Sequence, residues 1–431
     1  MAIIQQALLN RTTSPASSSM TMIPTTASFG GTEQEGSTSG YGIPAWGWQN
    51  SGTNMVSNGT RGLIPDHTTT NHWFVYGSGT ASPWGGSWPK EACGMRTTDN
   101  GLSWTQSGIS NVMYDSSANF STWYGWDTNG STSSPVWIVA GGAYPNSSTT
   151  TSGGSDIAIY KSTNLTSWSR IRVTPDHSYG GSTINQTFAD VCYCNGSWVL
   201  LNAKTGNTTR STNNGSSWSS HANCFNSFSS GIKLATDGNS KIVASGNNGF
   251  LATSTDSGAS WSRQQYPTNN TRMWGLNYIT GSLTVGSSTK GPGVWVAMGG
   301  NYTSGWANNT SDGERMVYSE DGTNWSEIDV NNDTNLPYRG THGSLKGITD
   351  TKEGLFLTWT YDGSVWELYG SHNSLTNWFK ISDNPFVGTM NNGSPYTLHG
   401  GAYYNKRYMI GSGIGPVYRG AAGRMSYIDF T

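Results

Sequence analysis

One short motif recurs along the chain and constrains its fold more than any other feature. A Ser or Thr is followed two residues later by Asp or Asn, and four or five residues after that by Trp. A unit that returns every few dozen residues is typical of solenoids, propellers and other arrays. Six copies occur in succession, at Thr97–Trp104, Ser162–Trp168, Ser211–Trp218, Ser254–Trp261, Ser319–Trp325 and Ser371–Trp378.

Each copy has the spacing of a β-hairpin turn. The Asp or Asn side chain is expected to accept backbone amide hydrogens further along the turn, and the Gly present in most copies tolerates positive φ. The Trp begins the returning strand and is large enough to pack as a wedge between one small sheet and the next. We therefore predict structural roles for Asp99, Trp104, Asn164, Trp168, Asn213, Trp218, Asp256, Trp261, Asp321, Trp325, Asn373 and Trp378.

The motif resembles the Asp-box, or BNR, repeat family. The segment Ser254–Trp261 matches the family pattern Ser-x-Asp-x-Gly-x-x-Trp at every position. Two copies, at Ser162 and Ser319, are one residue short, and the copies at Ser162 and Ser371 use Asn for Asp and lack the Gly. The resemblance implies a β-propeller in which each hairpin carries one box.

Short strand patterns surround each motif. An alternating run precedes the box, a more hydrophobic run lies before that, and turn signals such as Asn195-Gly196 connect it to an earlier strand. The unit thus has four strands, and we predict an all-β, seven-bladed β-propeller of four-stranded antiparallel blades with Asp-box hairpins. A six-bladed ring is the alternative if Tyr41–Gly52 is not a strand. The predicted blades are 41–107, 123–173, 188–220, 230–263, 273–328, 342–381 and 396–431, and the last has lost its box at Tyr418–Arg424.

The first 40 residues differ from the rest of the chain. They are dominated by Ser, Thr, Gly and Pro, and their only charged side chains are Arg11, Glu33 and Glu35. A segment of this composition is expected to be disordered unless an assembly holds it. We therefore divide the chain into an extended N-terminal arm, 1–40, and a propeller, 41–431.

The composition narrows the classes of partner and cofactor. Charged residues make up 11% of the chain and the formal net charge is −2, which argues against a nucleic acid or an anionic membrane surface. No apolar run is long enough to span a membrane, and the start of the chain does not resemble a secretion signal. Cys93, Cys192, Cys194 and Cys224 do not form a metal-binding pattern and are expected to be free thiols. We expect no cofactor and no metal site.

Three long loops contain the candidate ligand-binding residues. They connect second to third strands at Ser78–Ala92, Gly142–Ser155 and Gly300–Glu314, on the propeller face opposite the boxes. Aromatic rings among Ser, Thr, Asn and Gly suit uncharged sugars, and the same mixture also serves protein contacts or the packing of the loops themselves. The candidate glycan platform consists of Trp84, Trp88, Tyr144, Tyr302 and Trp306.

An enzymatic alternative follows from the same resemblance, because Asp-box propellers include sialidases and other glycosidases. The resemblance implies a Phe/Tyr-Arg-Ile-Pro motif, whereas Tyr41-Gly42-Ile43-Pro44 has Gly where the carboxylate-binding Arg is required. A general glycosidase needs only two suitably spaced carboxylates. The available candidates are Asp127, Asp190, Asp350, Glu353 and Glu367, and nothing in the sequence selects a pair, so no catalytic residue is assigned.

Three functional hypotheses remain open. The first is a non-catalytic component of a bacteriophage virion, assembled in the host cytoplasm, whose arm contacts other capsid or tail proteins and whose loops contact a host-surface glycan or protein. A homo-oligomer within such an assembly is compatible with the sequence. The second is a glycoside hydrolase acting as a depolymerase or sialidase. The third is an intracellular assembly or scaffold propeller, as in the photosystem II assembly factors that also resemble this repeat.

Overall fold

The fold is described from a computed structural model. It describes residues 49–50, 53–54, 57–79, 92–101, 105–106, 121–143, 158–173, 178–179, 182–183, 188–203, 205–219, 222–225, 231–265, 271–301, 315–328, 347–352, 354–361, 366–383, 397–413 and 425–429. Within these ranges the chain is built from strands and turns, and no helix is long and apolar enough to cross a membrane. The predicted all-β class is confirmed.

Five four-stranded antiparallel sheets follow one another in the described part of the chain, and we number them as units. The second unit is β7 (Ser121–Thr128), β8 (Trp137–Ala143), β9 (Ala158–Ser162) and β10 (Trp168–Arg172). The third is β13 (Phe188–Cys194), β14 (Ser197–Asn202), β15 (Asn207–Ser211) and β16 (Ala222–Asn223). The fourth is β17 (Gly231–Thr236), β18 (Ile242–Gly246), β19 (Phe250–Ser254) and β20 (Ser262–Gln265).

The fifth and sixth units complete this series. The fifth is β21 (Thr271–Ile279), β24 (Val294–Asn301), β25 (Arg315–Ser319) and β26 (Ser326–Ile328). The sixth is β27 (Ile348–Asp350), β28 (Leu355–Tyr361), β29 (Trp366–His372) and β30 (Phe379–Asp383). Three small pairs lie outside the ring sheets: β1 (Gln49–Asn50) with β2 (Thr53–Asn54), β11 (Ser178–Tyr179) with β12 (Ser182–Thr183), and β22 (Leu283–Val285) with β23 (Ser288–Lys290).

The remaining strands form one seven-stranded sheet. The first unit is β3 (Ser57–Pro65), β4 (Trp73–Gly79), β5 (Ala92–Thr97) and β6 (Thr105–Gln106). The last strands, which we call the closing strands, are β31 (Thr397–Tyr404), β32 (Arg407–Gly413) and β33 (Met425–Asp429). One residue pair, Gly59 with Gly413, connects β3 to β32 and joins both sets into a single sheet.

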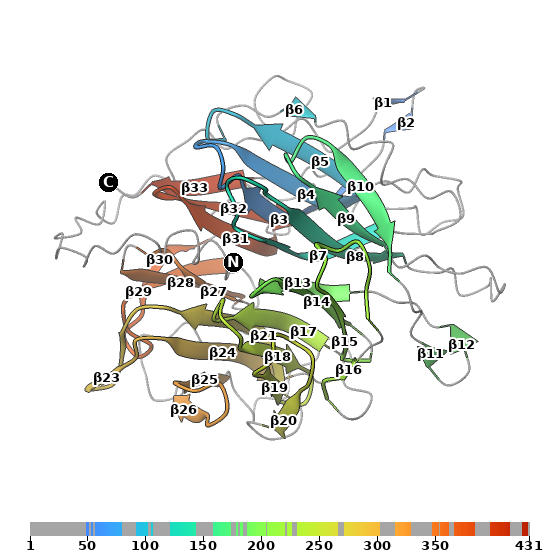
Figure 1. Ribbon diagram of the computed structural model, residues 1–431. Coiled ribbons are helices and arrows are strands. Elements are labelled where there is room, and N and C mark those ends of the chain that lie inside the picture. Colours follow the sequence, from blue (N-terminus) through green and yellow to red (C-terminus); the bar gives the residue numbers. More distant parts are fainter. Residues whose placement is uncertain are drawn as a thin grey trace.

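The sheets are arranged as a propeller ring (Figure 1). Short fourth strands such as β6, β20 and β26 lie at the periphery of the view, and the first strands lie toward the middle. The four-stranded propeller architecture is therefore confirmed. The count of seven blades is wrong for the described residues, and the six-bladed alternative is confirmed: they form six ring sheets, because the Gly59–Gly413 pairing merges the two predicted terminal blades. Of the predicted strand at 41–52, the described residues Gln49 and Asn50 pair only with Thr53 and Asn54.

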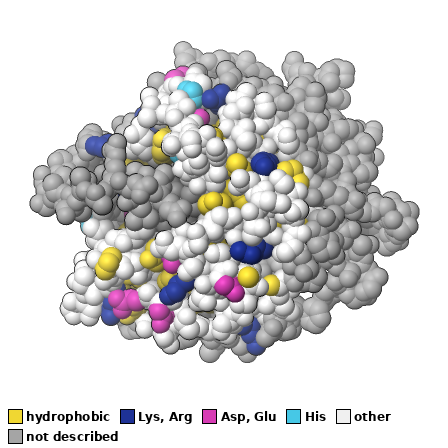
Figure 2. All heavy atoms as spheres, in the orientation of Figure 1, with side chains coloured by type: hydrophobic (Ala, Val, Ile, Leu, Met, Phe, Trp, Pro, Cys, Tyr) yellow, Lys and Arg dark blue, Asp and Glu magenta, His cyan; other side chains and the backbone are white. Residues whose placement is uncertain are grey.

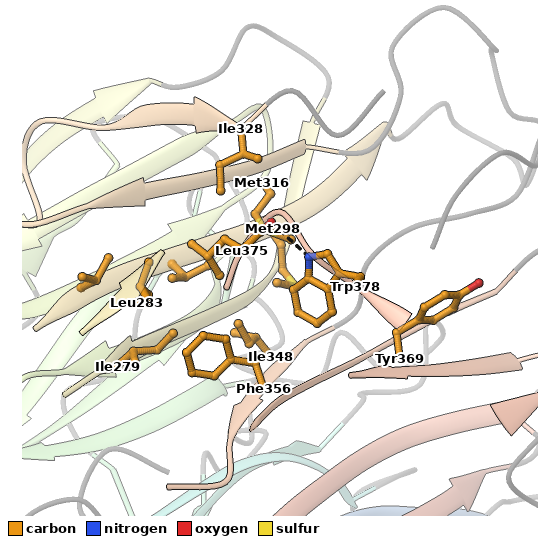
Figure 3. Packing of buried hydrophobic residues seen from close by; sticks show 12 residues of the cluster. Ile279, Leu283, Met298, Met316, Ile328, Ile348, Phe356, Tyr369, Leu375 and Trp378 are labelled. Carbon is orange, nitrogen blue, oxygen red and sulfur yellow. Dashed lines mark hydrogen bonds between the residues drawn. The ribbon is translucent and has the colours of Figure 1, made fainter. Parts of the chain in front are cut away.

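The hydrophobic core lies between neighbouring sheets. Every residue of β14 is buried, which a strand shows when both faces of its sheet are covered. Trp73, Trp137, Trp198 and Trp295 occupy corresponding places near the starts of second strands, and each is at most 1% exposed. Figure 3 shows such a core between the fifth and sixth units, where Met298 and Met316 pack with Phe356 and Trp378. Each sheet therefore covers the apolar faces of its neighbours.

The repeated motif forms a turn organised by its first hydroxyl, and we call it the repeat turn. In the copy at Ser254, the hydroxyl donates to Asp256 Oδ1 (2.8 Å) and accepts from the amide of Gly258 (2.8 Å). Asp256 Oδ1 in turn accepts from the amides of Ala259 (3.0 Å) and Ser260 (2.9 Å). Gly258 has a φ of 86°, a left-handed conformation that favours glycine. The side chains thus satisfy the backbone donors that the hairpin turn leaves unpaired.

In the five repeat turns whose Trp is described, this Trp packs between its own sheet and the preceding one. Trp168 lies in a cluster with Phe74 of the first unit and Val139 of the second. Trp218, with Ile138 and Leu200, occupies the next boundary. Trp168, Trp218 and Trp378 are buried, and Trp261 and Trp325 are half-buried. The side chain of Trp104 lies outside the described residues.

A second set of contacts connects each of the first five units to the repeat turn of the next unit, and the closing strands to the repeat turn of the first unit; we call these contacts clasps. Most are made by a Lys or Arg side chain that donates to a backbone carbonyl, and the fifth unit instead uses the β22–β23 hairpin. The clasps are Arg96 Nη1 to Thr166 Oγ1 (2.8 Å), Lys161 Nζ to Asn214 O (2.7 Å), Arg210 Nε to Ser257 O (3.0 Å), Lys241 Nζ to Asp321 O (3.0 Å), Thr284 N to Asn373 O (2.8 Å) and Arg407 Nη1 to Asn100 O.

The repeat turn gives the first prediction. Asp256→Ala removes the acceptor for two backbone amides and should lower the free energy of unfolding by about 1–2 kcal/mol. Asp256→Asn should cost less than half as much, because Asn already occupies this position in the turns at Asn164 and Asn213. Urea denaturation of the two variants measures the difference. Equal losses for Ala and Asn would contradict the role given to the side-chain oxygen.

The close contact between the second and third units gives another prediction. A Cβ atom on Gly125 would lie 2.7 Å from the Cα of Asp190, so the two first strands would have to separate. Gly125→Ala should therefore destabilise the protein by about 1–3 kcal/mol. Gly281→Ala is the matched control, since a Cβ there meets nothing within 4 Å and should leave the melting temperature nearly unchanged. Similar melting temperatures for both variants would refute the contact.

Candidate functional site

The loop residues chosen from the sequence lie outside the described residues, but the strands that carry them are described. Trp84 and Trp88 lie between β4 and β5, Tyr144 between β8 and β9, and Tyr302 and Trp306 between β24 and β25. Each segment joins the second to the third strand of its unit, whereas the repeat turns join third to fourth strands. In an antiparallel sheet these connections leave from opposite ends. The described strand ends from which these segments leave therefore lie opposite the repeat turns.

The first strands bring together two of the candidate carboxylates. Asp127, on β7, accepts from the amide of Thr128 (2.8 Å) and, across the unit boundary, from the amide of Tyr193 (2.8 Å). Asp190, on β13, accepts from the amide of Leu234 in the fourth unit (2.9 Å) and lies 3.4 Å from Lys233 Nζ. Asp127 and Asp190 are 2% and 4% exposed. Both carboxylates therefore hold neighbouring first strands together.

The environment of Asp127 changes its acidity. Burial raises the pKa of its carboxyl to about 6, and the hydrogen bonds from the Tyr193 and Thr128 amides act in the opposite direction. A pKa near 6 suits a general acid. However, the two carboxylate oxygens accept backbone hydrogen bonds in a position that solvent barely reaches. This geometry favours a structural role.

The sixth unit contains a buried group that sequence reasoning found only in part. The Tyr369 hydroxyl donates to Glu367 Oε2 (2.8 Å), and Lys380 Nζ donates to Glu367 Oε1. Glu367 and Tyr369 are each 7% exposed, while the Lys380 side chain is 42% exposed. Glu367 was among the candidate carboxylates, but Tyr369 and Lys380 were not predicted. Alternation along β29 places Glu367 and Tyr369 on one face, a signal that the sequence did contain.

The other candidate carboxylates do not complete a catalytic pair. Asp350 ends β27 at the clasp end of the sixth unit and forms an ion pair with Lys352, whereas Glu367 begins β29 at the opposite end. Glu353 lies outside the described residues. Asp99 and Asp321 bond within their own repeat turns, to Thr97 and Ser319. Partial burial acts to raise the pKa of Asp321, but amide hydrogen bonds from Asn324 and Thr323 outweigh it and hold the pKa well below its usual value.

The described residues also lack a metal-binding group. No cluster of three or more His, Cys, Asp or Glu side chains occurs in the described ranges. Cys192, Cys194 and Cys224 are buried free thiols, and burial raises the pKa of each. On the face that Figure 2 shows, most of the described atoms belong to the backbone or to uncharged polar side chains, and acidic and basic side chains occur at scattered points.

An aromatic–cation pair was not found from the sequence. The Arg272 guanidinium lies over the ring of Trp274, 5.2 Å from its centroid, at the start of β21. Arg272 is opposite Gly300, at the base of the segment that carries Tyr302 and Trp306. Neither the repeat nor the strand pattern marked these residues, because a β-bulge between Arg272 and Gly275 interrupts the alternation there.

Comparison with solved structures places the chain among propellers. YCF48 bound to a D1 peptide superimposes with a TM-score of 0.50 at 13% identity, covering 89% of this chain and 97% of that one. The GH74 xyloglucanase of Xanthomonas campestris gives a TM-score of 0.54 at 15% identity, covering 83% of this chain and 51% of the enzyme. No family model and no curated protein matches the sequence. At these identities the similarity establishes the fold alone.

The acidity of Asp127 gives a prediction with a definite sign. Its pKa is about 6 in the folded protein and 3.8 as an ordinary carboxyl, so between these values the folded state holds a proton that the unfolded state has lost. This group's contribution therefore makes the free energy of unfolding fall by about 2 kcal/mol as pH rises from 4 to 6, out of about 3 kcal/mol over the whole titration. Urea denaturation across this range should show the fall in the wild type and its loss in Asp127→Asn. Parallel pH curves for the two proteins would contradict the assignment.

Proposed function

We propose that the protein is a non-catalytic recognition propeller of a bacteriophage particle. Residues 1–40 attach it to other capsid or tail proteins. The second-to-third-strand loops contact a neutral glycan or a protein on the host surface. The absence of catalysis is supported by the candidate carboxylates that are buried in the described residues, because they form hydrogen bonds and ion pairs with other parts of the fold. Asp127 and Asp190 bind backbone amides of the next unit, and Glu367 binds Tyr369 and Lys380.

The engagement of these carboxylates bears directly on glycosidase chemistry. A general acid must donate its proton to the leaving group, and its partner must reach the sugar or a water molecule. Asp127 and Asp190 would have to break bonds that join first strands before either could act. With a low charge and loops rich in aromatic, hydroxyl and amide side chains, reversible binding of uncharged groups is the activity best supported.

The particle location rests on the sequence. The N-terminal 40 residues have a composition that does not support a packed core by itself, and an assembly would supply the contacts that hold them. The neutral, Ser-, Thr-, Gly- and Asn-rich propeller is suited to presentation on a particle surface. In this account the protein is assembled into virions in the host cytoplasm, without a nucleic-acid or membrane partner.

A second candidate is an assembly propeller that binds a protein segment. The specific observation is that YCF48, seen bound to a D1 peptide, is covered over 97% of its length, so a single propeller of similar extent can bind a peptide. Copurification of one defined protein through the loop end, in cells that contain no particles, would favour this candidate over the first.

Removal of the arm tests the particle assignment. A phage whose gene encodes only residues 41–431 should produce a soluble, folded propeller that is missing from purified particles. The matched control is the full-length chain with Gly281→Ala, which should be incorporated normally. Circular dichroism checks folding, and quantitative mass spectrometry of purified particles measures incorporation. Normal incorporation of the truncated chain would contradict the role given to residues 1–40.

Incubation with host surface polysaccharide tests the non-catalytic part separately. We expect the full-length protein to bind the polysaccharide and to release no new reducing ends. If the full-length protein releases reducing ends, and Glu367→Gln still binds the polysaccharide but releases none, the protein is a glycosidase instead.

A further inference from the structure

The side-chain clasps come from two positions in the units that make them. One is the residue immediately before the Ser or Thr of the unit's own repeat turn, occupied by Arg96, Lys161 and Arg210 in the first three units. Thr253 holds this position in the fourth unit, and its hydroxyl donates to Gly322 O of the fifth. The other position lies at the start of the second strand, where Lys241 clasps the fifth unit. Arg407 uses the corresponding place in β32.

The sixth unit has no donor at either position. Gly370 precedes Ser371 and has no side chain. Leu355 takes the place of Lys241, as shown by the matching turn bonds from Thr351 N to Leu355 O and from Asp237 N to Lys241 O, both 3.1 Å. The nearby Lys352 bonds instead to Asp350 and to Thr280 of the fifth unit. The sixth unit therefore cannot make the side-chain clasp that the first four units make.

The sequence motif that forms the acceptor turn in the other units does not recur in the closing strands, where Tyr418–Arg424 has neither the Asp nor the Trp. Among the described residues, the sixth unit therefore has no side chain at either clasp position that could reach the closing strands.

Two buried polar side chains meet at this boundary. Thr349 of β27 and Tyr408 of β32 are both 0% exposed. Burial raises the pKa of the Tyr408 phenol, and a side-chain hydrogen bond with Thr349 acts in the opposite direction.

The closing strands are held more firmly on their other side. Arg407 clasps the repeat turn of the first unit at Asn100, and Gly413 pairs with Gly59. Ala402 and Met409 pack with Trp73 and Val75 of the first unit in one buried cluster. The closing strands therefore remain with the first unit when the ring is strained.

We propose that the ring opens reversibly at one boundary, between the sixth unit and the closing strands, and that the other boundaries stay closed. The opening carries the closing strands away from β27–β30 while they remain attached to the first unit. The opening thus lies on the side of the closing strands that is away from the Gly59–Gly413 pairing. The presence or absence of a clasp determines which boundary opens.

Thiol labelling of the full-length protein tests the proposal. Thr349→Cys places a buried thiol at the unclasped boundary, and Ala235→Cys places one at the corresponding second-to-last residue of β17, facing the clasped fifth unit. With N-ethylmaleimide under native conditions, the thiol at position 349 should react at least about tenfold faster than the thiol at 235. The rates should become equal in denaturant. Peptide mapping by mass spectrometry separates these sites from the native cysteines.

A third variant tests whether clasps determine where opening occurs. Cys192 lies in the core between the third and fourth units, a boundary that Arg210 clasps. Arg210→Met should raise the labelling rate of Cys192 several-fold, while Arg210→Lys should raise it less, with circular dichroism confirming that both variants are folded. Equal rates at 349 and 235 would overturn the proposed opening. An unchanged labelling rate of Cys192 in Arg210→Met would show that clasps do not determine which boundary opens.

Discussion

The structure depends on contacts between neighbouring sheets, because a four-stranded sheet by itself leaves both apolar faces in water. The second strands show this most clearly, since β14 is buried along its whole length and Trp198 is fully enclosed. Indoles from five described repeat turns fill the outer part of the boundaries between consecutive units, and clasps fix these turns. Burial of the second strands is therefore a property of the ring, and no single unit can supply it alone.

The repeat made much of this architecture predictable. The spacing from Ser254 to Trp261 predicted a side-chain-bonded hairpin turn, and the hydrophobic runs predicted the second strands. The Asn195-Gly196 turn was also predicted correctly, as both residues have positive φ. The number of ring sheets was not predictable, because it depends on one pairing between Gly59 and Gly413, residues more than three hundred positions apart. No local pattern records such a contact.

The candidate site was less predictable for a different reason. Five carboxylates were candidates from the sequence, and none could be preferred, since spacing along separate strands does not reveal which amides lie across a boundary. Asp127 and Asp190 prove to bind the backbone of the next unit. The clasp donors had a signal that was overlooked: a cation directly before the motif at Arg96, Lys161 and Arg210. The next three units have Thr253, Tyr318 and Gly370 at this position, so the cation marks only the first three clasps.

The central claim is that the units stabilise one another through their boundaries, and differential scanning calorimetry of the full-length protein tests it most directly. If the ring is one cooperative structure, the heat absorbed should form a single transition whose calorimetric enthalpy equals the van't Hoff enthalpy. Several resolved transitions, each with the enthalpy expected for a sheet of about 40 residues, would show that the units are stable independently and would contradict the account.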